Sequence, residues 1–275
     1  MAEPKTAHNG VAPALELRSV RFGYRKGEPI IDGIDISLEA KTVTTLIGPN
    51  GCGKSTALKL MAGMLQPESG AAMIRGEDLR WIPSRVRARR IAYLMQSPRP
   101  PAMTVRQLVE CGRFPHRSAS GTNRERDEGA IVSALDATDT AILANRDLTS
   151  LSGGQRQRAF LAMALAQETE VLLLDEPTTY LDVGASHSIM ALIRRLCESE
   201  GKTVIQVVHD PDLAMRYSDN VAVMEHGRLI CMGGPGCAET LKAASEAFGI
   251  AIKQARCEEE TVFAAFPETH GHPQR

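Results

Sequence analysis

A glycine-rich stretch between positions 48 and 56 has the residue types and spacing of a phosphate-binding loop, G-x-x-x-x-G-K-[ST]. The apolar, β-branched residues 43–47 precede it and apolar residues at helical spacing follow it, so the pattern predicts strand, loop and helix. Backbone N–H groups of such a loop converge on an anion, and the helix directs its positive end at the same point. We therefore predict phosphate binding by Gly48, Pro49, Asn50, Gly51, Cys52, Gly53, Lys54, Ser55 and Thr56.

Three side chains in or near this loop suit the other parts of a nucleotide. Lys54 supplies a mobile cation for the β- and γ-phosphates, and Ser55 supplies a hydroxyl for Mg²⁺. Tyr24 lies in a turn before the loop, where an aromatic ring can stack on adenine; a half-buried loop tyrosine is the alternative interpretation. An accidental glycine-rich turn is the alternative for the loop itself, and the flanking strand and helix argue against it.

Two carboxylates, Asp175 and Glu176, end an unbroken apolar run that starts at Val171. Such a run is typical of a buried parallel strand, and ligands gather at the carboxyl ends of these strands. Asp175 is placed to reach the Mg²⁺ shell, and Glu176 to orient or deprotonate a water molecule. A polar loop at a strand end is the alternative, and the phosphate loop weakens it.

His209 follows a second apolar run, at residues 203–208. A single histidine at a strand end is more often structural than catalytic. This one follows a strand that should end at the same edge of the sheet as Asp175, so it is a candidate for the same site.

Ser152 and Gln155 form the pattern of a capping box before an apolar helix. A well-capped helix start is therefore one interpretation. The residues between them, Gly153 and Gly154, expose backbone N–H groups at the positive end of that helix, which indicates a second anion site.

The composition is that of an ordinary globular protein, with 275 residues, 43% of them hydrophobic and 24% charged. A formal net charge of −1 argues against nucleic acid as a partner, and we interpret the arginines between 80 and 90 as a solvated helix face. No apolar run approaches the ~18 residues that span a bilayer, and residues 1–13 contain no secretory signal. We expect a cytosolic chain that reaches a membrane through a partner.

Together, these motifs resemble one family, the ATP-binding subunits of ABC transporters, over about residues 14–255. Residues 48–56 match its Walker A loop, 151–155 its LSGGQ signature and 172–176 its Walker B strand. Gln96 matches the glutamine of the Q-loop, and His209 matches the switch histidine. Residues 180–182 match the D-loop, which includes Asp182. Tyr24 lies where the adenine-stacking aromatic residue belongs.

The resemblance implies an α/β fold, a P-loop NTPase (RecA-like) core with an antiparallel β subdomain and an inserted α-helical subdomain. A single ABC ATPase domain would span residues 14–250. Its core would occupy about residues 14–96 and 167–240, and the helical subdomain about residues 97–166. We expect loosely ordered tails at 1–13 and 255–275.

The chain is also similar to importer ATPases for iron–siderophores, haem and cobalamin in four segments, at residues 104–116, 177–182, 216–219 and 248–250. The resemblance thus implies a subunit that hydrolyses ATP to power uptake of an iron–siderophore complex through a separate permease. The alternatives are an importer for haem, cobalamin or a metal ion, and a soluble ABC ATPase without a transport role. Pro211 departs from the family pattern, and it suits a first helical turn.

The resemblance also assigns chemical roles, with ATP and Mg²⁺ as cofactors. Ser55, Gln96 and Asp175 would surround Mg²⁺. Glu176 would be the general base, and His209 would contact the γ-phosphate or the attacking water.

ATP binding would join two copies of the chain head to tail. Lys54 of one copy and Ser152, Gly153, Gly154 and Gln155 of the other would hold each ATP, with Asp182 at the same interface. Permease subunits, indirectly served by a substrate-binding protein, would dock near residues 97–116 and hold the chain at the cytoplasmic face of the cell membrane.

Overall fold

The computed structural model describes residues 12–96, 100–117, 123–258 and 260–267. Its largest sheet has six strands in the order β10-β9-β3-β8-β7-β6. These strands are β3 (Val43–Ile47), β6 (Ile91–Leu94), β7 (Val171–Asp175), β8 (Thr203–Val207), β9 (Asn220–Glu225) and β10 (Arg228–Gly233). β10 is antiparallel to β9, and the other neighbours are parallel.

The central strands β3, β8 and β7 are buried along their whole length. A strand covered on both faces needs mostly apolar side chains on both, which is why Val, Leu and Ile predominate in all three. Because they are parallel, the segments that follow them leave the sheet at one edge. This edge receives the phosphate loop, the carboxylates and His209.

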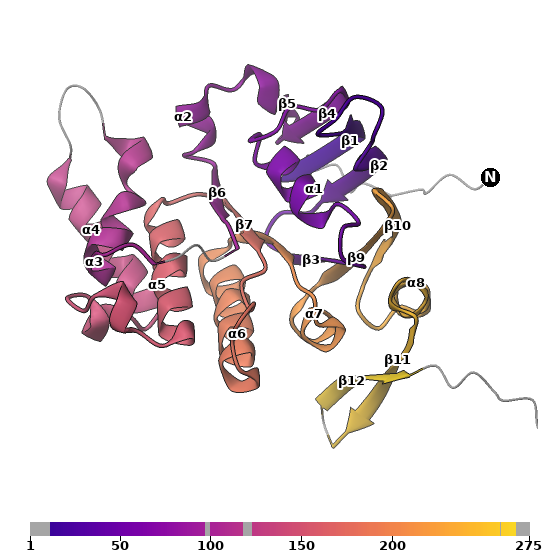
Figure 1. The fold of residues 1–275 in the computed structure, drawn as a ribbon. Coiled ribbons are helices and arrows are strands. Elements are labelled where there is room, and N and C mark those ends of the chain that lie inside the picture. The colour runs from indigo at the N-terminus through magenta and orange to yellow at the C-terminus, as the bar shows by residue number, and fades with distance from the viewer. Residues whose placement is uncertain (1–11, 97–99, 118–122, 259, 268–275) are drawn as a thin grey trace, which may run out of the picture.

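A second, antiparallel sheet has the strand order β2-β1-β4-β5. Its strands are β1 (Leu15–Phe22), β2 (Ile31–Leu38), β4 (Ser69–Ile74) and β5 (Glu77–Asp78). Helix α1 (Lys54–Met61) packs between the two sheets, since one hydrophobic cluster contains Leu58 of α1, Leu17 of β1 and Ile205 of β8. Figure 1 shows α1 beside this smaller sheet. The predicted antiparallel β subdomain is confirmed.

Three helices, α3 (Val105–Cys111), α4 (Arg124–Ala137) and α5 (Gly153–Ala166), pack together on the other side of β6 and β7 (Figure 1). Their core includes Leu108, Leu135 and Phe160, and it continues into α6 (Val183–Glu200) through Ile189. The short helix α2 (Ser84–Arg87) precedes β6. The predicted inserted helical subdomain is confirmed; residues 97–99 and 118–122 of its predicted range lie outside the described residues.

The C-terminal segment differs from the loosely ordered tail expected from residue 255. After α7 (Pro211–Tyr217) and α8 (Ala238–Phe248), the chain forms a hairpin of β11 (Ile250–Cys257) and β12 (Glu260–Pro267). Ile252 and Phe263 are buried with Met215 of α7, and this packing orders the segment. The expectation is therefore corrected to a hairpin that extends to residue 267. Residues 1–11 and 268–275 lie outside the described residues.

Candidate nucleotide-binding and hydrolysis site

The loop between β3 and α1 depends on glycine at both ends. A Cβ on Gly48 would lie 2.0 Å from the carbonyl oxygen of Met224, so a side chain has no room there. Gly53 is the N-cap of α1 with φ of 104°, a conformation that favours glycine, and no side chain caps this helix. The first N–H groups of α1 are therefore left for a ligand, and phosphate oxygens suit them.

Lys54 lies within the loop rather than in solvent. Its Nζ donates to the carbonyl oxygens of Gly48 at 2.8 Å and Pro49 at 2.9 Å, and the residue is 5% exposed. Asn50 and Gly51 form the exposed tip of the loop. A buried ammonium group held by uncharged carbonyl groups is a cation available to an anion that enters the loop.

Asp175 connects this loop to the neighbouring strands. Its Oδ1 accepts a hydrogen bond from Ser55 Oγ at 2.7 Å, and its Oδ2 accepts one from Tyr93 OH at 2.9 Å. Burial of Tyr93, together with the charge of Asp175, raises the pKa of the phenol well above its usual value. Tyr93 therefore keeps its proton and remains a donor to the carboxylate.

The oxygens of Ser55 and Asp175 fit a bound Mg²⁺. Mg²⁺ prefers oxygen ligands, takes one or two from protein carboxylates and completes its shell with phosphates and water. Ser55 Oγ and Asp175 Oδ1 already lie in contact beside the phosphate loop. Among the described residues, no group of three or more His, Cys, Asp or Glu side chains is placed to hold a metal ion.

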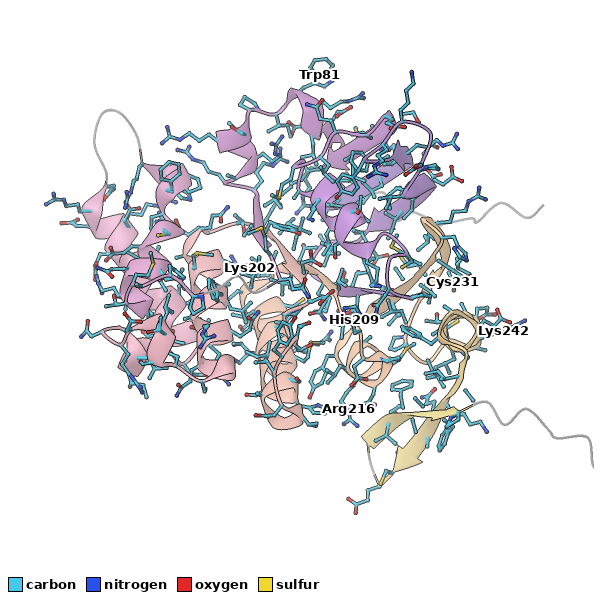
Figure 2. All side chains as sticks on the ribbon, viewed as in Figure 1. Trp81, Lys202, His209, Arg216, Cys231 and Lys242 are labelled. Carbon is cyan, nitrogen blue, oxygen red and sulfur yellow. The ribbon has the colours of Figure 1, made fainter. Side chains whose placement is uncertain are left out.

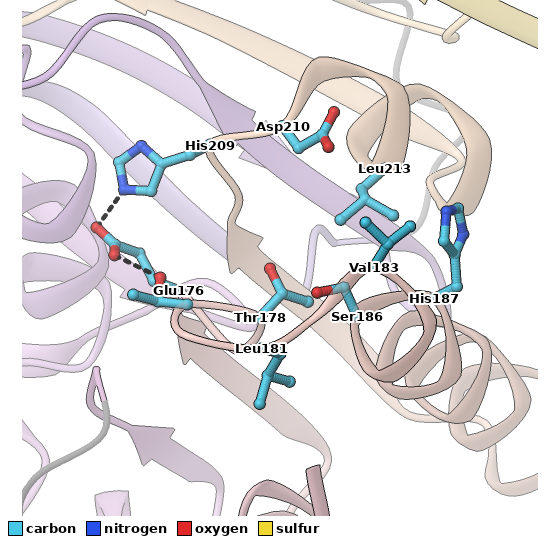
Figure 3. A pocket seen from close by; sticks show the side chains of 10 residues that line it. Glu176, Thr178, Leu181, Val183, Ser186, His187, His209, Asp210 and Leu213 are labelled. Atoms are coloured by element: carbon cyan, nitrogen blue, oxygen red, sulfur yellow. Dashed lines mark hydrogen bonds and ion pairs between the residues drawn. The ribbon is translucent and has the colours of Figure 1, made fainter. Parts of the chain in front are cut away.

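Glu176 is surrounded by donors. His209 Nε2 lies 2.6 Å from its Oε1, while Gln96 Nε2 and Thr179 Oγ1 donate to its Oε2 at 2.6 and 2.9 Å. The Glu176 backbone has φ of 54°, and its N–H donates to the Val207 carbonyl oxygen of β8 at 3.2 Å. Figure 3 shows Glu176 and His209 at one end of a cavity of about 250 Å³.

A continuous set of contacts thus joins residues that are far apart in the sequence. Ser55 contacts Asp175, the adjacent Glu176 contacts both Gln96 and His209, and Lys54 precedes Ser55. Figure 2 marks His209 near the centre of the molecule, where the helical and β-rich halves meet.

The start of α5, unlike that of α1, is capped by its own side chains. Ser152 Oγ accepts from the Gln155 N–H at 3.3 Å, and Gln155 Oε1 accepts from the Ser152 N–H at 3.2 Å, so the predicted capping box is confirmed. A Cβ on Gly154 would lie 3.3 Å from Ala185 Cβ, which places this end beside the start of α6. There, Asp182 Oδ1 accepts from the Ala185 N–H at 2.7 Å.

The structure does not bring the start of α5 to the phosphate loop of the same chain. α5 and α1 lie on opposite sides of β6 and β7 (Figure 1), and no hydrogen bond between described residues joins the two helix starts. Ser152 and Gly153 are instead exposed. The two predicted anion sites are therefore separate in one chain.

Tyr24 is more exposed than a half-buried loop tyrosine. It is 57% exposed, and its ring meets Phe22 edge-on with the ring centroids 5.0 Å apart. The contact with Phe22, at the end of β1, supports one edge of the ring and leaves much of it open to a ligand.

Sequence reasoning missed two residues of this site. Tyr93 lies on β6, and its register opposite Leu173 on β7 is what brings its hydroxyl to Asp175. Thr179 donates to Glu176 from the following turn. A hydroxyl three residues after a carboxylate is a signal for such a turn, because that spacing permits a side-chain contact.

The fold and the site define the class of protein, a P-loop nucleoside triphosphatase. Comparison with known proteins gives the family, since a family model described as ABC transporter matches residues 31–179. The chain therefore belongs to the ABC transporter family.

Two relatives and one solved structure illustrate the similarity. The achromobactin transport ATP-binding protein CbrD of Dickeya dadantii (strain 3937) is 44% identical over 81% of this chain and 82% of that protein. The iron(3+)-hydroxamate import ATP-binding protein FhuC of Bacillus subtilis (strain 168) is 43% identical over 80% of this chain and 82% of that protein. The dimeric ATP-binding cassette MJ0796, bound to ADP and Pi, superposes with a TM-score of 0.70 at 27% identity, over 80% of this chain and 98% of that chain.

This chain is accordingly the ATP-binding and ATP-hydrolysing subunit of an ABC importer. Subunits of this kind pair with membrane permeases. Within the part of the chain that the structure describes, no helix has the length and apolar character needed to cross a membrane.

Proposed function

We propose that this chain powers the uptake of an iron–siderophore complex through a separate permease, at the cytoplasmic face of the cell membrane. The names of the two relatives support this cargo, because one serves achromobactin and the other iron(3+)-hydroxamate. The observation that carries the enzymatic part is the set of contacts from Ser55 through Asp175 and Glu176 to His209.

The phosphate loop and Lys54 hold the phosphates of ATP in this proposal. Lys54 exchanges its bonds to the Gly48 and Pro49 carbonyl oxygens for charge-assisted bonds to phosphate oxygens, which are stronger. Tyr24 stacks on the adenine ring, for which its exposure and its edge contact with Phe22 leave space.

Ser55 and Asp175, with Gln96, would hold Mg²⁺. When bound, the ion neutralises charge on the β- and γ-phosphates. Tyr93 keeps one oxygen of Asp175 occupied and so leaves the other, now bonded to Ser55, directed toward the loop.

Glu176 acts as the general base. It accepts a proton from a water molecule whose oxygen bonds to the γ-phosphorus, while the bond from that phosphorus to the β–γ bridging oxygen breaks. His209 contacts the γ-phosphate or the attacking water from the end of β8. The cavity beside Glu176 and His209 provides access to both side chains (Figure 3).

A second copy of the chain completes each site. Because the start of α5 lies on the other side of β6 and β7 from α1, we propose that Ser152, Gly153, Gly154 and Gln155 contact ATP held by a head-to-tail partner. Asp182 lies at the same interface, since it caps α6 beside the start of α5.

The permease docks near residues 97–116, of which 97–99 lie outside the described residues. An open cavity of about 370 Å³ lies in this region, between α2 and the turn Phe114–His116. Phe114 at its wall is 73% exposed, and Arg85 and Arg89 each donate to the Pro115 carbonyl oxygen at 3.0 Å. An exposed aromatic ring beside a cavity suits an apolar side chain of a partner.

The cargo is tested by uptake of radioactive iron bound to a siderophore in cells that lack this gene. The wild-type gene should restore uptake, and the Glu176→Gln variant should not. Cobalamin uptake in the same strains is the control for cargo. Undiminished siderophore uptake in the deletion strain would contradict the proposal.

The enzymatic roles are tested with purified protein. Glu176→Gln keeps the size of the side chain but removes the base, so hydrolysis should fall by about 100-fold or more while ATP binding is retained. Slow hydrolysis should trap a dimer in MgATP, which size-exclusion chromatography detects. Turnover near the wild-type rate would remove Glu176 from this role.

A further inference from the structure

We propose that Thr179 is a positioning residue that aims the carboxylate of Glu176. The inference rests on the proposed role of Glu176 as general base. Thr179 Oγ1 donates to Glu176 Oε2 at 2.9 Å, and the Thr179 N–H donates to the Glu176 carbonyl oxygen at 3.3 Å. The two residues are therefore joined twice within one tight turn.

The three donors around Glu176 differ in how they are attached to it. Gln96 follows β6 and is exposed, and His209 follows β8 with a side chain that is 44% exposed. Both reach Glu176 across the edge of the sheet from other segments. Thr179 instead belongs to the same turn as Glu176, so it keeps its place relative to the carboxylate when the ends of neighbouring strands shift.

The Glu176 carboxylate needs such a donor because the backbone of Glu176 does not by itself hold the side chain in place. It lies just after β7, and its φ of 54° takes it out of the strand conformation. A non-glycine residue in this region is strained, and contacts around it must hold it there. The backbone bond to Val207 holds the main chain, and the Thr179 hydroxyl is the donor from the same turn that holds the side chain.

The two carboxylate oxygens of Glu176 also have different hydrogen-bond partners. Thr179 and Gln96 occupy Oε2, while His209 occupies Oε1. A base needs one oxygen directed at its water molecule, so donors on both oxygens oppose catalysis. In the proposed function, Gln96 and His209 turn to the metal and the γ-phosphate. Thr179 then remains on Oε2 and leaves Oε1, which now faces His209, free for the water molecule.

The alternative is that the Thr179 hydroxyl only satisfies a polar group of the folded chain. In that case its loss lowers stability, and hydrolysis and ATP binding fall together. The two interpretations predict different changes in kcat and KM. A hydrogen bond that aims the base acts on the chemical step, so its loss lowers kcat and leaves ATP binding unchanged.

The test compares Thr179→Val, which keeps the shape of the side chain and removes the donor, with Thr179→Ser, which keeps the donor. Thr178→Val is the matched control, since its hydroxyl makes no hydrogen bond to any residue that the structure describes. We measure kcat and KM for MgATP, the thermal midpoint, and the lifetime of the MgATP-induced dimer by size-exclusion chromatography.

Thr179→Val should lower kcat by about tenfold, with KM within about twofold of the wild type, because it removes one hydrogen bond to a charged group. Its dimer should persist longer, since ATP is consumed more slowly. Thr179→Ser should recover kcat to within about threefold of the wild type, and Thr178→Val should stay within about twofold. In a Glu176→Gln background, Thr179→Val should add no further loss.

An unchanged kcat in Thr179→Val would overturn the inference. So would a fall in kcat and thermal midpoint, with a rise in KM, that serine fails to recover. A loss in Glu176→Gln with no loss in Thr179→Val refutes the role of Thr179 alone. Normal turnover in Glu176→Gln refutes the proposed function instead, so the two failures are distinguishable.

Discussion

Two helix starts in this molecule suit anions, and they are built in opposite ways. α1 begins at Gly53 without a side-chain cap, next to the buried Lys54. α5 begins at Ser152 with a complete capping box, and Ser152 is exposed. One start leaves its N–H groups to a ligand, whereas the other satisfies two of its donors with its own side chains.

The difference indicates which start binds ATP first. An uncapped helix end beside a buried cation gains its missing hydrogen bonds when phosphate enters, so α1 should hold ATP within a single chain. α5 has less to gain because Ser152 and Gln155 already cap it. We expect α5 to add stabilisation only when a nucleotide is presented by another copy, which would link hydrolysis to assembly.

Lys54→Ala should have the largest effect, because it removes the only charged side chain of the α1 start. We expect ATP affinity to fall by about 100-fold or more, since several charge-assisted bonds to phosphate are lost. Titration with a fluorescent ATP analogue measures this. Lys59→Ala, in the last turn of the same helix, is the control and should bind normally. A loss of less than about tenfold would mean that α1 is not the primary site.

A pair of glycine substitutions compares how much each helix start contributes to the free energy of unfolding. Gly53→Ala places a Cβ at φ of 104°, 3.0 Å from the carbonyl oxygen of Ile30, so unfolding free energy should fall by about 1–3 kcal/mol. In Gly153→Ala the near contact is the movable end of Leu181 at 3.0 Å, the Tyr180 carbonyl oxygen lies at an ordinary 3.8 Å, and the helix gains propensity. Its net change should be less than about 1 kcal/mol by urea unfolding. Equal losses in the two variants would contradict this view of the starts.

Local sequence was sufficient where a segment's own pattern decides its structure. The phosphate loop requires its glycines, β7 requires apolar residues on both faces, and the Ser152 capping box is closed within four residues. Pro211 likewise begins α7 as predicted, with Asp210 as the cap. In each case the determining contacts lie within a few positions along the chain.

Local sequence was insufficient where tertiary packing decides. Tyr93 reaches Asp175 only because β6 pairs with β7 in one register, and nothing near Tyr93 specifies that register. The hairpin of β11 and β12 is ordered by burial of Ile252 and Phe263 against α7, while the polar side chains of Lys253, Gln254 and Arg256 remain exposed. Contacts of this kind depend on segments distant in the sequence.

Removing the cap of α5 has a small effect on stability and gives the sharpest comparison of the two helix starts. Ser152→Ala removes the oxygen that accepts from the Gln155 N–H, so unfolding free energy should fall by about 1 kcal/mol. ATP affinity of the single chain should not change, because α1 supplies it. Hydrolysis should fall by about tenfold, since the hydroxyl is also lost from the proposed contact with the partner's nucleotide.

A second capping box in the same helical subdomain supplies the matched control. Thr104 caps α3 by accepting from the Gln107 N–H at 3.2 Å, so Thr104→Ala should cost a similar free energy without any effect on hydrolysis by the isolated subunit. Measured ATPase rates over a range of protein concentrations, beside equilibrium unfolding, separate the two effects. If both variants lost hydrolysis equally, stability alone would explain Ser152. If neither did, the start of α5 would not contact nucleotide, and the difference between the two helix starts would be structural rather than functional.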